Sequence, residues 1–182
     1  MSLYEKFNKE IKPELKKELG KKNINEVPKL DKIVVSMGIW SLVTRKWVKD
    51  FSDLEENLKV ITGQKPHIIK ARKSVSNFKL REGMPVMLRV TIRGKRAYDF
   101  IDRLVKYVLP RVRDFRGVSP KKFDGKGNLN IGLKSQMVFP ELTPDDIKTP
   151  QGIQVTIATT SAVDEEAQKL LEKLWIIFLQ TK

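Results

Sequence analysis

The chain has 182 residues, of which 40% are hydrophobic, and this is enough for one domain with a hydrophobic core. Its net charge of +14 indicates an anionic partner, which means nucleic acid or an anionic membrane surface. The absence of cysteine excludes disulfides, thiol catalysis and cysteine-liganded zinc, and no apolar stretch approaches the roughly 20 residues that span a bilayer.

Apolar residues with helical spacing predict four helices, which cover about residues 2–19, 45–62, 96–109 and 164–174. Pro13 should kink or split the first helix, and Gly20 should end it. Thr44 is the expected N-cap of the second helix, whose apolar stripe consists of Trp47, Phe51, Leu54, Leu58 and Ile61. Gly63 should end that helix, and Asp164 should cap the last one. The charged first segment is not a signal peptide, so a cytoplasmic protein is expected.

Strict alternation of apolar and polar residues predicts strands over residues 32–38, 89–94, 128–134 and 152–160. One face of each strand is apolar, and the other carries Arg, Thr, Ser, Asn, Gln and Gly but no carboxylate. This pattern predicts an α+β fold, a two-layer sandwich in which helices pack on one face of an antiparallel sheet. The other face would be open and usable by RNA, although the same polar residues also suit a merely solvated strand.

The positive charge is concentrated in the middle of the chain. Residues 65–96 contain ten Lys and Arg against one acidic residue, whereas residues 141–182 contain four against seven. A long basic loop is predicted at about 70–85, between a strand that ends near Ile69 and one that starts near Pro85. Long ordered loops are disproportionately functional, and cations on this one can reach phosphates; the alternative is a solvated surface. Its cations are Lys70, Arg72, Lys73, Lys79 and Arg81.

No catalytic constellation is apparent, so we expect no enzyme, no cofactor and no metal. His67 is the only histidine, and the adjacent Asp145 and Asp146 are expected to cap a helix or turn after Pro144. The segment "DGKGNLNIG" (124–132) lacks the spacing of a phosphate-binding loop and predicts a turn into a strand. The alternative function, an RNA-processing or RNA-modifying enzyme on the same basic surface, would need a constellation that the sequence does not offer. Membrane binding is not expected, because the apolar stripes are committed to the core.

Three aromatic residues outside the predicted helical stripes are candidates for a contact with RNA. Trp40 follows a strand and a glycine, and both a core position and a stacking platform remain open for it. Phe78 and Phe115 lie in basic segments and would pack under RNA or stack on it, with packing favoured for Phe115.

Six segments in series resemble the bacterial-type ribosomal protein number five of the large subunit, which binds 5S ribosomal RNA. They are "VPKLDKIVVSMG", "ITGQKPHIIKARKSVSNFKLREGMPV", "RVTIRGKRAYDFIDRL", "LPRVRDFRGVS", "FDGKGNLNIG" and "GIQVTIATTSAVDEEAQKLL". The resemblance covers nearly the whole chain and implies a single α+β domain over residues 1–182 that is not an enzyme and needs no cofactor. It also implies a place on the cytoplasmic ribosome, in the central protuberance, beside 5S ribosomal RNA, large-subunit ribosomal RNA and neighbouring ribosomal proteins. The basic loop would reach transfer RNA in the peptidyl site, and the protein would contact a small-subunit head protein across the subunit bridge.

Carried over to this sequence, the resemblance assigns two sets of contact residues. The 5S ribosomal RNA set is Ser36, Met37, Gly38, Gln64, Lys65 and Thr91, to which the strand pattern adds Arg89 and Arg93. The transfer RNA set is Lys70, Arg72, Lys73, Ser74, Lys79 and Arg81.

The chain departs from the family's pattern at two positions near the first strand. Ser36 stands where the family has Asn, and its hydroxyl has a shorter reach than an amide. Trp40 stands where the family has a glycine, so the loop at 38–44 is expected to take a different path. The apolar end "LWIIFLQTK" would dock against a neighbour.

Overall fold

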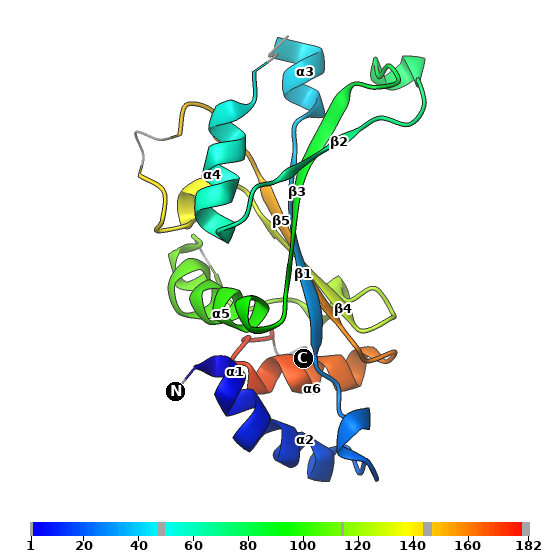
Figure 1. Ribbon diagram of the computed structural model, residues 1–182, viewed down its shortest axis with the longest axis vertical. Coiled ribbons are helices and arrows are strands. Elements are labelled where there is room, and N and C mark those ends of the chain that lie inside the picture. The colour runs from blue at the N-terminus through cyan, green and yellow to red at the C-terminus, as the bar shows by residue number, and fades with distance from the viewer. Residues whose placement is uncertain (1, 47–49, 114, 144–146, 180–182) are drawn as a thin grey trace. The chain divides into compact units, whose positions relative to one another are not determined.

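The computed structural model describes residues 2–46, 50–113, 115–143 and 147–179 (Figure 1). Its five strands form an antiparallel sheet in the order β2-β3-β1-β5-β4, which confirms the predicted α+β class. The strands are β1 (Leu30–Gly38), β2 (His67–Lys70), β3 (Pro85–Arg93), β4 (Asn128–Leu133) and β5 (Ile153–Thr159). The α-helices are α1 (Leu3–Lys6), α2 (Lys12–Glu18), α3 (Trp40–Lys46), α4 (Ser52–Thr62), α5 (Lys95–Arg103) and α6 (Asp164–Lys173).

The chain divides into two compact units. The first comprises Met1–Ile33, Ile92–Ile131 and Thr156–Lys182, and the second comprises Val34–Thr91 and Gly132–Val155. The single domain expected over the whole chain therefore stays a prediction.

The strands bury the apolar face that their alternation predicts. These residues are Ile33, Val35, Met37, Leu88, Val90, Ile92, Leu129, Ile131, Leu133, Ile153, Val155 and Ile157. The intervening residues of β3 and β4 are exposed or half-buried, as is Thr156 of β5, whose hydroxyl donates to the Asn130 side-chain oxygen at 2.7 Å. Because successive side chains of a strand point to opposite faces, the core and the polar face follow from the same pattern.

The first helix of the sequence forms as predicted, and a π-helical turn accommodates its proline. The turn Phe7–Ile11 lies between α1 and α2, and Pro13 follows near the start of α2. A proline ring clashes with the carbonyl four residues earlier in a regular helix, and a wider turn at that point relieves the clash. Gly20, at φ +62°, lies just beyond the end of α2, where it was expected to stop the helix.

The helix predicted over residues 45–62 is wrong in its first part. The structure has α3 and, separately, α4, which begins only at Ser52. Its last residue is Thr62, and Gly63 follows in the left-handed conformation as the predicted stop. Thr44 is not an N-cap, because it lies inside α3 and its hydroxyl donates to the Trp40 carbonyl at 2.9 Å. The Asp50 carboxylate accepts from the Ser52 backbone N–H at 3.0 Å and so serves the start of α4. Residues 40–46 are accordingly helix rather than loop, and Trp47 lies outside the described residues.

The expected capping role of Asp164 is also wrong. Asp164 is the first residue of α6, and the N-cap residue is Val163, which has no side-chain capping bond. The Asp164 carboxylate instead accepts backbone N–H bonds from Gly125 at 3.0 Å and Gly127 at 2.7 Å. It therefore fixes the turn that leads into β4, a turn that the sequence did predict.

The apolar C-terminal segment, as far as the structure describes it, pairs with the chain's own residues. Val118 N–H donates to the Ile177 carbonyl at 2.8 Å, Leu179 N–H donates to the Val118 carbonyl at 3.0 Å, and the Phe178 ring stacks on Phe123. The indole of Trp175 lies under two ammonium groups, those of Lys6 and Lys106. Ile177 nevertheless remains 63% exposed and Leu179 39% exposed, so docking of this segment on a neighbour stays a prediction. Residues 180–182 lie outside the described residues.

Candidate nucleic-acid interface

The basic loop of the sequence is an ordered hairpin, residues 71–84, which we call the basic hairpin. At its base Ala71 N–H donates to the Met84 carbonyl at 2.8 Å, and Gly83 N–H donates to the Ala71 carbonyl at 3.0 Å. Near its tip Val75 and Leu80 exchange two backbone bonds, at 2.9 and 3.1 Å. The basic hairpin continues β2 and β3 beyond their ends (Figure 1). The predicted loop between these strands therefore has a defined backbone.

The turn at the tip places a lysine in an uncommon conformation. A 3₁₀ turn covers Ser76–Phe78, and Lys79 follows it in the left-handed region at φ +52°. A side chain other than glycine in this region costs about 1–2 kcal/mol, and such residues concentrate at functional sites. Behind the turn, the Ser74 hydroxyl accepts from the Glu82 backbone N–H at 2.9 Å, so this predicted contact residue also braces the basic hairpin.

The cations of the basic hairpin are exposed and are not committed to carboxylates of the protein. Lys70 at its foot and four further cations, Arg72, Lys73, Lys79 and Arg81, are all exposed or half-buried. Within the part of the chain that the structure describes, none of their side chains forms an ion pair. Unpaired cations on a fixed backbone are free to bind phosphate oxygens.

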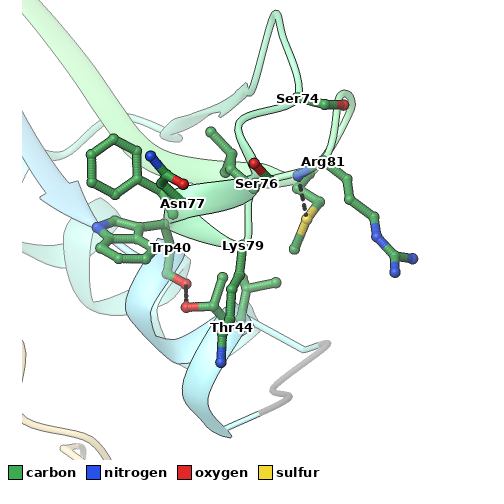
Figure 2. Close-up of a pocket in the computed structure, with 11 residues that line it drawn as sticks. Trp40, Thr44, Ser74, Ser76, Asn77, Lys79 and Arg81 are labelled. Carbon is green, nitrogen blue, oxygen red and sulfur yellow. Dashed lines mark hydrogen bonds between the residues drawn. The ribbon is translucent and has the colours of Figure 1, made fainter.

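The basic hairpin and α3 enclose a groove of about 1250 Å³ (Figure 2). Two large exposed aromatics line it: the Trp40 side chain is 36% exposed and that of Phe78 is 63% exposed. The sequence did not decide whether Trp40 lies in the core or forms a stacking platform, and it gave no reason to place Trp40 near Phe78. The available signal was that both aromatics lie outside the predicted apolar stripes. Only the fold shows that α3 and the basic hairpin bring them to one groove.

Strand β3 carries the residues predicted for the open sheet face. Arg89 and Arg93 are exposed and Thr91 is half-buried, whereas the alternate residues Leu88 and Val90 are buried. Arg89 is paired in register with His67 of β2, which is also exposed. Three consecutive alternate positions of one strand therefore present two guanidinium groups and a hydroxyl on the same face.

The predicted contact residues at the end of β1 differ in what they can offer a partner. The Met37 side chain is fully buried, so only its backbone is available, and Ser36 is 9% exposed. Gly38 is exposed, and its carbonyl accepts from the Gln151 side chain at 2.7 Å. A contact here would therefore involve mainly the backbone around Gly38.

Gln64 and Lys65 follow the left-handed end of α4. The Thr62 hydroxyl donates to the Leu58 carbonyl at 2.7 Å and accepts from the Gln64 backbone N–H at 3.3 Å, which fixes the chain as it leaves the helix. Gln64 is half-buried, and Lys65 is exposed. The structure thus presents Lys65 as a further cation on a rigid corner just before β2.

Catalytic and metal chemistry finds no support in the described ranges. There, no group of three or more His, Asp or Glu side chains is placed to hold a metal ion. Asp145 and Asp146 lie outside the described residues. In the same ranges, every helix is too short or too polar to cross a bilayer.

Comparison with known proteins identifies the family. A family model described as ribosomal protein L5 matches residues 23–81, and a second model, which describes the C-terminus of the same ribosomal family, matches residues 85–178. The chain belongs to the ribosomal protein L5 family. The first match ends and the second begins near the end of the basic hairpin, and only residues 82–84 lie between them.

Several relatives resemble the chain over nearly its full length. "Large ribosomal subunit protein uL5" of Natranaerobius thermophilus is 56% identical over 97% of each chain. Its namesake in Thermotoga maritima is 52% identical over 93% of this chain and 91% of its own length. The namesake in Macrococcus caseolyticus is 51% identical over 97% of each chain. These relatives bear the name of a ribosomal protein and not of an enzyme, which agrees with the absence of catalysis that the sequence predicted.

Proposed function

We propose that this chain is a structural constituent of the large ribosomal subunit that anchors 5S ribosomal RNA. The single observation that carries the RNA contact is β3, which exposes Arg89, Thr91 and Arg93 on one face and buries the alternate residues in the core. The likeness of the whole chain to proteins named for the large subunit supports the place of action.

The two cationic surfaces have different tasks in this proposal. The face of β3, with the end of β1 and Lys65, binds 5S ribosomal RNA. The basic hairpin, with Arg72, Lys73 and Lys79, contacts transfer RNA in the peptidyl site. The remaining contacts of the proposal, with large-subunit ribosomal RNA, central-protuberance proteins and a small-subunit head protein, follow the family resemblance.

Binding is dominated by cations that pair with phosphates, while the sheet face supplies shape and contacts to base edges. Each phosphate neutralised releases counterions, so the logarithm of affinity falls with the logarithm of salt with a slope of about 0.7–0.9 per phosphate. Loss of two phosphate-binding guanidinium groups should therefore both weaken binding and flatten the salt dependence by roughly 1.5.

The test is a filter-binding titration against 5S ribosomal RNA at several salt concentrations, with transfer RNA as competitor. Arg89→Ala/Arg93→Ala should weaken 5S binding and flatten its salt dependence, whereas Arg72→Ala/Lys73→Ala should leave both nearly unchanged. Lys9→Ala/Lys17→Ala is the matched control, because it removes two exposed charges from the N-terminal helical segment. Equal effects of the three double variants would show that net charge alone governs binding and would refute the division of tasks.

A further inference from the structure

A concentration of cations that the proposed function does not use lies in residues 111–122, which we call the arginine loop. It contains one acidic residue against five cations, all of them exposed: Arg111, Arg113, Arg116, Lys121 and Lys122. In residues 2–22, by contrast, seven Lys and Arg are interspersed with four acidic residues, which offset much of their charge. The arginine loop is therefore the stronger of these two unassigned cationic segments.

The cations of the arginine loop are not committed to carboxylates of the protein. Among the described residues, none of their side chains forms an ion pair. Carboxylates are not lacking in the same compact unit, where Lys21, Lys106 and Lys173 pair with them at 2.6, 2.8 and 3.2 Å. Like charges that stay unpaired repel one another, and a bound polyanion removes that repulsion. The arginine loop is therefore a candidate binding site for an anionic partner.

The backbone of the arginine loop is held by the C-terminal segment. Val118 N–H donates to the Ile177 carbonyl at 2.8 Å. A 3₁₀ turn then covers Pro120–Lys122, and just beyond it Phe123 stacks on Phe178, with the ring centroids 5.8 Å apart. Because this backbone is fixed, binding costs less entropy than it would in a disordered basic tail.

The surroundings of these cations favour the backbone of helical RNA over unpaired bases. Proteins hold unpaired bases by stacking them on exposed aromatic side chains. The aromatics of this region, Phe115 and Phe123, are half-buried, and no large apolar side chain is exposed among the described residues between 109 and 126. Double-helical RNA, in contrast, is recognised mainly through its shape and its phosphates, and guanidinium groups bind phosphates with paired hydrogen bonds.

The source of this RNA follows from what an anchor requires. A protein that anchors 5S ribosomal RNA must bind both that RNA and the remainder of the subunit. The proposed 5S residues, apart from Arg93, belong to the unit formed by Val34–Thr91 and Gly132–Val155, whereas the whole arginine loop belongs to the other unit. The basic hairpin is already assigned to transfer RNA. The arginine loop is therefore left for the RNA of the large subunit itself.

We propose that the arginine loop binds the phosphate backbone of a double-helical segment of large-subunit ribosomal RNA. The inference rests on the proposed 5S function and adds the second attachment point that anchoring requires. The contacts of β3 and of the arginine loop are separable. A change in the arginine loop leaves 5S ribosomal RNA bound to the protein but weakens the hold of this complex on large-subunit ribosomal RNA.

The first experiment titrates the complex of the protein with labelled 5S ribosomal RNA against purified large-subunit ribosomal RNA, at several salt concentrations. Arg113→Ala/Arg116→Ala should weaken this association by about 10-fold or more, because charge-assisted hydrogen bonds to two phosphates are lost. The same variant should flatten the salt dependence by roughly 1.5. Its affinity for 5S ribosomal RNA itself should stay nearly unchanged.

Two double variants control for net charge. Lys9→Ala/Lys17→Ala removes the same charge from another exposed segment and should leave the association nearly unchanged. Arg113→Lys/Arg116→Lys keeps the charge of the arginine loop and should retain the salt dependence of the wild type. An equal loss of affinity in Lys9→Ala/Lys17→Ala and Arg113→Ala/Arg116→Ala would overturn the proposal.

Thermal unfolding of each variant separates a folding defect from a binding defect. Arg113→Ala/Arg116→Ala should unfold at nearly the wild-type temperature, because both side chains are exposed. If this variant is unstable, Lys121→Ala/Lys122→Ala decides the question in its place, since it removes two other exposed cations of the arginine loop. An unchanged affinity of the folded variant for large-subunit ribosomal RNA would overturn the proposal.

The second experiment identifies the occupant by hydroxyl-radical footprinting, which reports the protection of RNA backbone, with 5S, large-subunit and transfer RNA all present. The wild type should protect a helical segment of large-subunit ribosomal RNA, and Arg113→Ala/Arg116→Ala should lose that protection while the 5S footprint stays. Loss of protection on transfer RNA or on 5S ribosomal RNA instead would overturn the proposal. So would an unchanged footprint together with lost binding to a ribosomal protein, because the partner would then be a protein.

Failure of this inference is distinguishable from failure of the proposed function. If the wild type prefers 5S ribosomal RNA but its complex does not associate with large-subunit ribosomal RNA through the arginine loop, only the inference fails. If the wild type shows no preference for 5S ribosomal RNA over transfer RNA, the proposed function itself fails.

Discussion

Gly127→Ala should destabilise the protein far more than Gly125→Ala, although both glycines have positive φ in the same turn. Gly127 has φ +73° and Gly125 has φ +80°, so the backbone cost of a side chain is similar at the two positions. Their surroundings differ. A Cβ on Gly127 would lie 2.5 Å from the Ser161 carbonyl oxygen, whereas a Cβ on Gly125 would meet nothing within 4 Å.

The magnitudes follow from four contributions. A non-glycine residue at positive φ costs about 1–2 kcal/mol, and alanine recovers about 0.4–1 kcal/mol because it restricts the unfolded chain. Gly125→Ala should therefore cost about 1 kcal/mol. At Gly127 the overlap with a backbone atom adds about 1–3 kcal/mol, as overpacking does in cores. The shift also strains the bond from the Thr159 hydroxyl to the Gly127 carbonyl, which is 2.8 Å long and is worth about 1 kcal/mol. The total for Gly127→Ala is about 2–5 kcal/mol.

Urea unfolding of both variants and the wild type, followed by circular dichroism, measures the difference. The slope of the free energy of unfolding against urea should stay the same in all three, so that the midpoints report stability alone. Equal losses for the two variants would show that Ser161 moves aside without cost and would refute the argument from close approach.

Three further predictions concern the basic hairpin, the core and α6. Lys79→Gly should relieve the left-handed strain by about 1 kcal/mol and so slow hydrogen exchange of the Val75 and Leu80 amides. Lys79→Met should not slow this exchange, and faster exchange in the glycine variant would contradict the prediction. Burial raises the pKa of Tyr98 from 10.0 to about 12, so the unfolded phenol ionises first and the free energy of unfolding should fall between about pH 10 and pH 12. Tyr98→Phe should lack that part of the fall in urea unfolding, and an unchanged pH dependence would refute the assignment. Asp164→Ala should lower the free energy of unfolding by about 2–4 kcal/mol, because it removes two hydrogen bonds to a carboxylate. Glu165→Ala, at the same end of α6, should lower it by less than about 1 kcal/mol. Thermal unfolding of the two variants measures this difference.

The strands were predictable because their signal is local. A strand that buries one face must alternate, and a shift by one residue would expose every apolar side chain, so Val90 and Ile92 reveal both the strand and its register. The sheet face of Arg89 and Thr91 followed from the same pattern, without any knowledge of neighbouring strands. The paired backbone of the basic hairpin was harder to predict from the sequence, because its hydrogen bonds join residues across a turn in which apolar residues do not alternate regularly.

The second helix shows how a correct apolar stripe can give a wrong boundary. Phe51 belongs to the stripe and is 7% exposed, but its backbone is not helical, with φ −117° and ψ 13°. It reaches the core from the position before α4, so burial alone does not distinguish it from a helical residue. Asp164 shows the other limit. An acidic residue at a helix start usually serves the helix, but its partners here are amides 37 and 39 residues away along the chain.

Charge alone is a poor guide to the RNA contacts proposed for this protein. The cations of the basic hairpin are carried by a backbone with paired amides at its base and tip, so a bound RNA need not order the chain that presents them. Lys9 and Lys17 of the N-terminal helical segment are equally exposed, but they do not line the groove between α3 and the basic hairpin. A long-range electrostatic attraction would treat these sites alike, whereas direct contacts with a fixed surface act only over contact distance. A difference in binding between variants of equal net charge would therefore measure what the fold contributes beyond the charge of +14.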